Sequence, residues 1–152
     1  MSKLTFPMFL AVVFIGWGFS HPTQEAKLTS TLTVRFENLE PAGGTIRLAL
    51  YDRQDHFMME EKAVLYSFKI SREGTLEAEL PGLSYGTYAF AVFQDENENR
   101  KLDKNLFGVP VEAYCFSKTA SSKWRLPKFG EVKFEVNQPR QTLTVRLEKW
   151  KL

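Results

Sequence analysis

Apolar and polar residues alternate along most of the chain from about residue 28 onward. Seven stretches repeat with a period of two, and they span 32–36, 46–50, 64–70, 76–80, 88–93, 132–136 and 143–147. Successive side chains of a β-strand point to opposite faces, so each stretch has an apolar side that must be buried. No stretch repeats convincingly every 3.6 residues, as a helix would. The pattern therefore predicts seven β-strands and an all-β protein.

Turn-forming residues separate these stretches. They lie at 41–44, 72–74, 81–82, 86 and 137–139. Short strands divided in this way favour a seven-stranded antiparallel Greek-key sandwich of two sheets. The stretch at 88–93 is apolar on both sides, which predicts that both of its faces are buried. Tyr88 follows a glycine corner where such sandwiches often place a tyrosine bonded to nearby backbone, so we interpret it as a structural residue.

The N-terminal segment has the composition of a secretion signal. Lys3 is the only charged residue before Glu25, and an apolar core runs from residue 9 to residue 17. This core is shorter than the stretch of about 20 residues that spans a membrane as a helix. The segment is therefore predicted to be a cleaved signal peptide, and an uncleaved N-terminal anchor is the alternative.

Small residues indicate where such a signal is cut. Gly18 and Ser20 occupy the two positions that signal peptidase recognises, which predicts cleavage after Ser20, with cleavage after Ala26 as the alternative. We expect a signal peptide over 1–20 and a single sandwich domain over 28–148. The mature protein is then periplasmic, secreted or at the cell surface, and it has no membrane span after cleavage.

Charge and composition narrow the classes of partner. The 152-residue chain has 20 basic and 18 acidic residues, and its formal net charge is +2. The charges are interspersed, without the basic block that marks a nucleic-acid interface, so we expect no nucleic-acid partner. Cys115 is the single cysteine, so no intrachain disulfide can form. We interpret it as a buried, unreactive residue, and pairing between chains is the alternative.

One connection between the predicted strands is much longer than the others. It runs from residue 95 to residue 128, a span of about 34 residues that exceeds usual loop lengths. Long loops on a rigid scaffold often carry function, so we expect functional residues in this segment.

The first part of this loop has the spacing of a calcium-binding loop. Oxygen-bearing side chains recur at Asp95, Asn97, Asn99 and Asp103, and the backbone carbonyl of Lys101 falls between them. Ca²⁺ prefers oxygen ligands, and calcium loops supply them from alternate positions. These five residues are therefore a candidate for a weak Ca²⁺ site.

Two features of the same segment favour another interpretation. Arg100 stands at the sixth position, where calcium loops have glycine for a turn with positive φ. Lys101 and Lys104 add positive charge. The alternative is an Asx-rich turn, in which asparagine and aspartate side chains accept hydrogen bonds from backbone N–H groups.

The second part of the loop is rich in aromatic residues. Tyr114 and Trp124 are candidates for a surface that binds a sugar or a peptide. Glu112 is a candidate for the same surface, for a further metal ligand, or for an ion pair with Lys118 or Lys123. The alternative is that the aromatic side chains pack over the edge of the sandwich, because aromatic residues are usually buried where packing partners exist.

Several of these segments together resemble a known family. The residues that carry the resemblance are Leu32 to Val34, Ile46 to Asp52, Gly86 to Phe93, Asp95-Glu96-Asn97, Lys101-Leu102-Asp103, Gly108-Val109-Pro110, Glu112, Tyr114, Phe116-Ser117, Pro127-Lys128-Phe129 and Phe134. They look like the exported bacterial proteins called domain of unknown function family 2141. The resemblance spans about residues 28 to 148. It implies an immunoglobulin-like or transthyretin-like sandwich in the periplasm or at the cell surface, and it implies no established activity.

The chain departs from the family pattern in and after the candidate metal loop. Glu98 and Arg100 stand where the family usually has glycine, and Lys118 and Thr119 stand where it usually has asparagine. If the family's loop binds a cation, this resemblance implies that the present chain has lost the ion or holds it weakly.

Three classes of function remain. A non-enzymatic exported module, which binds or scaffolds an unknown protein, peptide or glycan at the cell envelope, agrees best with the signal, the sandwich and the Asx-rich loop. A carbohydrate- or peptide-binding module that uses the aromatic loop is the second class. A hydrolase-type enzyme is disfavoured, because His21, His56 and Cys115 provide too few groups for a recognisable catalytic site.

Overall fold

The structure is a computed structural model, and it describes residues 28–40, 43–71, 74–122 and 124–150. The predicted signal peptide at 1–20 and both predicted cleavage positions lie outside these ranges. Within them, no helix has the length and apolar character needed to cross a membrane.

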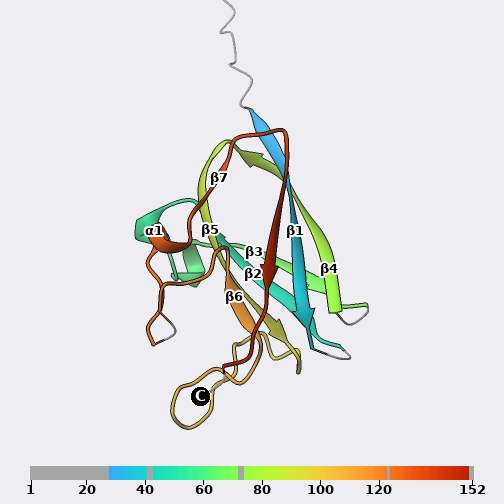
Figure 1. The fold of residues 1–152 in the computed structure, drawn as a ribbon, viewed down its shortest axis with the longest axis vertical. Coiled ribbons are helices and arrows are strands. Elements are labelled where there is room, and N and C mark those ends of the chain that lie inside the picture. The colour runs from blue at the N-terminus through green and yellow to red at the C-terminus, as the bar shows by residue number, and fades with distance from the viewer. Residues whose placement is uncertain (1–27, 41–42, 72–73, 123, 151–152) are drawn as a thin grey trace, which may run out of the picture.

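The described residues form eight β-strands, two 3₁₀ helices and one short α-helix (Figure 1). The strands are β1 (Thr29–Leu39), β2 (Thr45–Tyr51), β3 (Val64–Lys69), β4 (Gly74–Ser84), β5 (Gly86–Asp95), β6 (Tyr114–Phe116), β7 (Phe134–Val136) and β8 (Arg140–Arg146). The helices are η1 (Gln54–His56), η2 (Glu60–Lys62) and α1 (Phe129–Val132). The predicted all-β class is confirmed.

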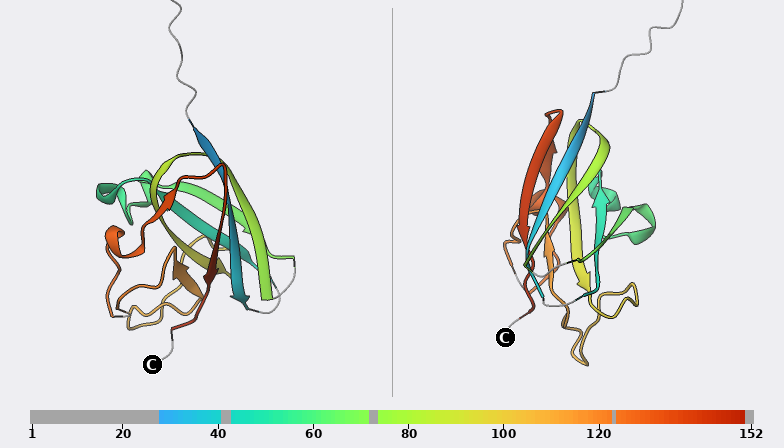
Figure 2. Two further views of the ribbon diagram at one scale, coloured as in Figure 1. Left: turned by 45° about the horizontal axis from the view of Figure 1, so that its top comes forward. Right: turned by 90° about the vertical axis from the view of Figure 1, so that its right-hand side faces the viewer.

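The strands are arranged in two sheets. The three-stranded sheet has the order β4-β1-β8. The five-stranded sheet has the order β3-β2-β5-β6, and β7 also pairs with β5. Figure 2 shows the sheets as two layers, with β1 and β8 in one layer and β2 and β5 in the other. The two sheets in two layers agree with the predicted β-sandwich.

The predicted number and direction of the strands need correction. The described part of the chain has eight strands rather than seven, because Tyr114–Phe116 forms β6, which is too short to show an alternating pattern. The strands are not all antiparallel, because β1 and β8 run parallel from the pair Thr31 and Arg140 to the pair Glu37 and Arg146. β8 follows β7, which lies in the other sheet, so no tight hairpin sets its direction relative to β1.

The main core lies between the two sheets. Its largest fully buried apolar side chains are Phe36, Phe90, Leu32, Ile46, Leu48 and Leu80. All of them lie on predicted apolar faces, and each contributes about 1.5–3 kcal/mol by its removal from water. Val64, which begins the predicted apolar face at 64–70, is an exception, because it is exposed on the edge strand β3.

A smaller apolar cluster covers the other side of β5. Its buried members are Tyr51, Ala89, Phe129 and Val132. The prediction that the stretch at 88–93 is buried on both sides is correct for Ala89, whereas Ala91 and Phe93 are half-buried. Val132 was predicted to begin a strand, but it ends α1, and in that position it packs into this cluster.

Tyr88 has the predicted structural role. Its hydroxyl donates a hydrogen bond to the backbone oxygen of Ser84 at 2.9 Å. Its ring lies 6.3 Å from that of Phe134. The side chain therefore fixes the corner at which the chain leaves β4 in one sheet and enters β5 in the other.

Gly44 lies where the start of β2 approaches the end of β5. Its φ of +86° is in the left-handed region, and a Cβ atom at this position would stand 2.3 Å from the backbone oxygen of Asp95. Only glycine avoids both the strain and the overlap. Gly82 also has a left-handed φ, of +74°, but a Cβ atom there would meet nothing within 4 Å.

Gly44→Ala is therefore expected to lower the free energy of unfolding by about 3 kcal/mol or more, since it adds backbone overlap to left-handed strain. Gly82→Ala, the matched control, adds only the strain and is expected to cost about 1–2 kcal/mol. Urea unfolding of both variants and the wild type measures the difference. Equal losses would show that the approach of Gly44 to Asp95 does not constrain the fold.

Candidate functional site

The longest connection between described strands lies at one end of the sandwich. It joins β5 to β6 over residues 96–113, and Figure 1 shows it beside the C-terminal end of the chain. The predicted loop of 95–128 is therefore two connections, because β6 pairs with β5 and divides it. The second connection, 117–128, leads from β6 to α1.

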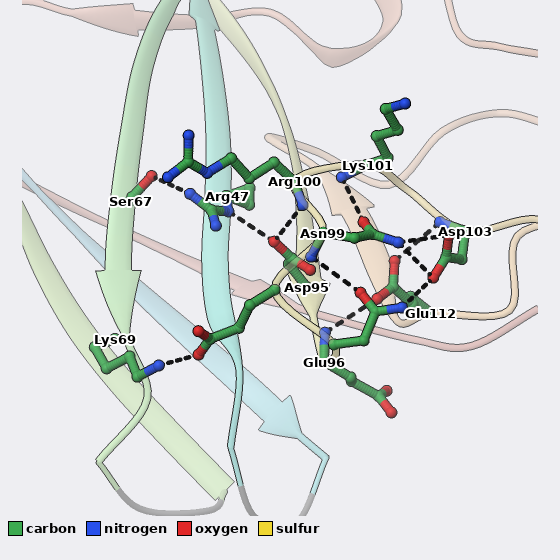
Figure 3. A network of polar contacts seen from close by, with 12 residues as sticks. Arg47, Ser67, Lys69, Asp95, Glu96, Asn99, Arg100, Lys101, Asp103 and Glu112 are labelled. Atoms are coloured by element: carbon green, nitrogen blue, oxygen red, sulfur yellow. Dashed lines mark hydrogen bonds and ion pairs between the residues drawn. The ribbon is translucent and has the colours of Figure 1, made fainter.

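The carboxylate of Asp95 is the buried centre of the first connection. Its side chain is 0% exposed. Its Oδ2 accepts hydrogen bonds from Arg47 Nε at 2.9 Å and from the backbone N–H of Arg100 at 3.0 Å (Figure 3). A buried charge requires such partners, because its removal from water is strongly unfavourable. The other oxygen, Oδ1, is buried and has no hydrogen-bond partner among the described residues.

Two asparagine side chains shape the turn that follows. The amide oxygen of Asn97 accepts the N–H of Asn99 at 3.1 Å, and that of Asn99 accepts the N–H of Lys101 at 2.8 Å. Both side-chain amide groups donate to the carboxylate of Asp103, Asn97 at 2.7 Å and Asn99 at 2.9 Å. These are the Asx turns expected as the alternative to a metal site. These contacts bring the side chains of Asn97, Asn99 and Asp103 together, and Asp95 joins the same turn through its bond from the N–H of Arg100.

Two residues of this turn have a left-handed backbone although neither is glycine. The φ of Glu98 is 61° and that of Arg100 is 66°. This conformation costs about 1–2 kcal/mol for a residue with a Cβ atom, so other contacts must hold it. Glu98 forms an ion pair with Lys69 of β3, and Asp95 accepts the N–H of Arg100. The turn therefore keeps a glycine-like shape without glycine.

Glu112 closes the base of the turn from the other end of the loop. It is only 4% exposed. Its two carboxylate oxygens accept the backbone N–H groups of Glu96 and Asp103, each at 3.0 Å. Its role at a ligand-binding surface stays a prediction, but Glu112 lies beneath the loop. The physical reason is that two backbone donors at the base of the loop require an acceptor.

The C-terminal segment after β8 is attached to the same end of the molecule. Glu148 exchanges two backbone hydrogen bonds with Tyr114, at 3.1 and 3.2 Å. Lys149 Nζ lies 2.8 Å from a carboxylate oxygen of Glu96, and this contact raises the pKa of Lys149. The connection 96–113, β6 and the C-terminal segment therefore form one linked unit.

The far end of the connection presents two apolar side chains to solvent. Leu106 is fully exposed and Phe107 is 90% exposed. The side-chain oxygen of Asn105 accepts the N–H of Phe107 at 2.9 Å and that of Val109 at 3.1 Å, while Gly108 has a φ of 77°. The sequence pattern did not identify this exposed pair in advance. One signal could have done so, because Leu106 and Phe107 are large apolar residues that stand between two turn-forming ones.

The aromatic residues from Tyr114 to Phe129 do not form a single surface. Tyr114 is half-buried, and its ring meets that of Phe116 edge-on with 6.2 Å between centroids. Trp124 is 83% exposed and meets Trp150 edge-on at 5.5 Å. Phe116 and Phe129 pack in the smaller apolar cluster. The packing interpretation therefore holds for the phenylalanines, whereas Trp124 is accessible to a ligand.

Glu131 of α1 anchors the second connection and was also missed from the sequence. Its carboxylate forms a two-point ion pair with Arg125, with both N···O distances at 2.8 Å. It also accepts the backbone N–H of Lys128 at 2.7 Å and the hydroxyl of Ser121. The bonds from Arg125, with those from Lys128 and Ser121, hold the pKa of Glu131 far below its usual range.

Cys115 is a poor nucleophile in this structure. It packs against the main core, and burial raises the pKa of its thiol, so little of the reactive thiolate exists at neutral pH. His56 lies in η1, where its Nδ1 is 3.9 Å from a carboxylate oxygen of Asp52. Within the described ranges, no group of three or more His, Cys, Asp and Glu residues is placed to hold a metal ion. A cation in the turn from Asp95 to Asp103 would therefore depend on amide oxygens as well as carboxylates.

Acid is expected to loosen the second connection only well below the usual pKa of a glutamate. The pKa of Glu131 is lowered by folding, so the stabilisation by its contacts is complete above about pH 4.3 and is lost as the pH falls through the folded pKa. An NMR pH titration that follows the Lys128 amide, which donates to Glu131, measures the midpoint. Arg125→Gln should raise this midpoint towards the usual value. A midpoint near 4.3 in the wild type would contradict the ion pair.

Comparison with known proteins agrees with the resemblance seen in the sequence. Neither the curated proteins nor the solved structures contain a match. One family model matches residues 34–144, which is more than half of the chain, and its description is "Uncharacterized protein conserved in bacteria (DUF2141)". The chain therefore belongs to this bacterial family, as its residues predicted.

Proposed function

We propose that the chain is a non-enzymatic exported module that binds a protein partner in the bacterial cell envelope through the tip of the connection 96–113. It acts in the periplasm, at the cell surface or after secretion. Its fold is a Greek-key sandwich of the immunoglobulin-like or transthyretin-like kind, an assignment supported by the two sheets and by the tyrosine corner at Tyr88. The composition of the first 20 residues supports export.

The exposure of Leu106 and Phe107 is the observation that carries this proposal. Single apolar residues on a surface are common, but two large ones side by side at the tip of a protruding loop favour a contact surface. Burial of either side chain against a partner contributes about 1.5–3 kcal/mol.

The base of the loop is suited to hold this tip in place. Asp95 and Glu112 fix the turn that precedes the tip, and Asn105 fixes the tip itself. A loop restrained by such contacts loses less conformational freedom when it binds, which strengthens binding for the same contact area. Restrained loops on a rigid sheet are common positions for recognition.

A photo-crosslinking residue in place of Phe107, in the full chain expressed in the source bacterium, is expected to give discrete adducts with one or a few envelope proteins. The same residue in place of Leu65 is the matched control, since Leu65 is 59% exposed on the edge strand β3. Adding Leu106→Ser should reduce the adduct, because it removes apolar contact area, and should change the free energy of unfolding by no more than about 0.5 kcal/mol. Mass spectrometry identifies the adducts.

Two results of this experiment would contradict the proposal. The first is the absence of an adduct at Phe107, and the second is the same set of adducts at Phe107 and Leu65. Fractionation of the same cells tests export separately, because recovery of the chain only from the cytoplasm would exclude the proposed location.

A second candidate function rests on the exposure of Trp124. An exposed indole can lie against a sugar ring or an apolar peptide side chain, and contact with Trp150 supports its ring from one side. These observations support the carbohydrate- or peptide-binding module as an alternative.

On this alternative, Trp124→Ala is expected to weaken binding to a glycan or peptide at least tenfold, because loss of one aromatic contact of about 1.4 kcal/mol has that effect. Leu126→Ala is the matched control, since Leu126 is also exposed in the same connection. Glycan and peptide arrays identify the ligand, and calorimetry measures the affinities. No binding on either array would exclude the alternative.

A further inference from the structure

We propose that the turn from Asp95 to Asp103 binds a hard divalent cation, Ca²⁺ before Mg²⁺, with Oδ1 of Asp95 as its buried ligand. This site is distinct from the apolar tip and does not depend on the function proposed above.

The unpartnered oxygen of Asp95 is the observation that carries this inference. The side chain is 0% exposed, yet its Oδ1 accepts no hydrogen bond from any described residue. Buried polar atoms almost always have a partner, and an exception in a carboxylate indicates an ion or water that completes it. In Figure 3 this oxygen is turned towards the inside of the turn, away from Arg47.

The other oxygens of the turn suit the same ion. Asp103 has both carboxylate oxygens directed at the side chains of Asn97 and Asn99. Each asparagine oxygen accepts one backbone N–H and keeps a second lone pair for a cation. Binding would exchange the bonds from the asparagine amides to Asp103 for bonds from the ion. Two carboxylates and two amide oxygens, completed by water, form the oxygen set that Ca²⁺ prefers.

The backbone already has the shape that a calcium loop requires. The sixth position of such loops needs a positive φ, and Arg100 supplies 66° because its N–H is bonded to Oδ2 of Asp95. Figure 3 shows the side chains of Arg100 and Lys101 directed away from the turn. Two of the three residues that counted against a cation in the sequence therefore direct their side chains away from its position.

The charge balance sets the expected affinity. Arg47 remains on Oδ2 of Asp95 and offsets one of the two carboxylate charges of the site. A site with so little net negative charge belongs with the weak extracellular calcium sites, whose dissociation constants lie near the millimolar range. Mg²⁺ demands near-ideal octahedral geometry and keeps most of its water, so a set of two carboxylates and two amide oxygens suits Ca²⁺ better.

The test is thermal unfolding of the full chain in excess EDTA and in about 10 mM CaCl₂, with MgCl₂ and NaCl of equal ionic strength for comparison. A millimolar site raises the Tm by roughly 4 °C in CaCl₂ and by clearly less in the other salts. Asp103→Asn should abolish the shift, because it removes one carboxylate. Asp52→Asn should keep it, because Asp52 is an exposed carboxylate outside the turn.

Two further variants keep the test decisive. Asn99→Ala removes an amide ligand without touching a charge, so it tests the site if Asp103→Asn does not fold. Arg100→Gly relieves strain at the sixth position and should tighten Ca²⁺ binding severalfold in calorimetry. No shift of the wild type in CaCl₂, an equal shift in NaCl, or an unchanged shift in both Asp103→Asn and Asn99→Ala would overturn the inference.

Discussion

The burial of one carboxylate, that of Asp95, is the constraint on which the loop end of the molecule depends. Asp95 ends β5 opposite Thr45 of β2, and this register brings Arg47 within hydrogen-bond distance of it. A charge in this position is tolerated only with close partners, which here are the Arg47 guanidinium and the N–H of Arg100. Gly44 is required at the same crossing, because a Cβ atom would overlap the backbone of Asp95. Strand register and turn shape therefore meet at the side chain of Asp95, and the backbone of the same residue requires glycine at position 44.

Much of the fold could be predicted because a strand buried on one side repeats every second residue. This holds for the stretches at 32–36 and 46–50, whose apolar side chains are buried. The prediction failed where a strand is too short to show alternation and where alternation continues outside a strand. β6 has only three residues, and Val132 continues the alternation of β7 but lies in a helical turn. The direction of β8 relative to β1 is not fixed by a tight hairpin, because β8 follows β7 of the other sheet, and residue spacing within β8 does not encode it.

The candidate site was predictable where its contacts are local. The turn from Asp95 to Asp103 contains its own hydrogen-bond partners, so the sequence showed which residues meet. Arg47 was not identified, because it lies 48 positions from Asp95 and reaches it only through strand pairing. In the sequence, Arg100 counted against a glycine-like turn because residues with a Cβ atom rarely adopt a positive φ. In the structure, the hydrogen bond from its N–H to Asp95 holds Arg100 at a positive φ. The exposed pair at the loop tip carries no periodic signal, and only its exposure identifies it.

Because β1 pairs in parallel with β8, the three-stranded sheet is complete only after this strand, the latest in sequence of the described strands, has joined it. β1 is the middle strand of its sheet, with β4 on one side and β8 on the other. Asn38 at the end of β1 bonds to Leu147 across a separation of 109 residues. Contacts so far apart in sequence are slow to form because a long loop must close first, and until they form one edge of β1 keeps its backbone groups unpaired. Until β8 has joined the sheet, the free edge of β1 is open to pairing with another chain, and a holding chaperone can cover that edge during the interval.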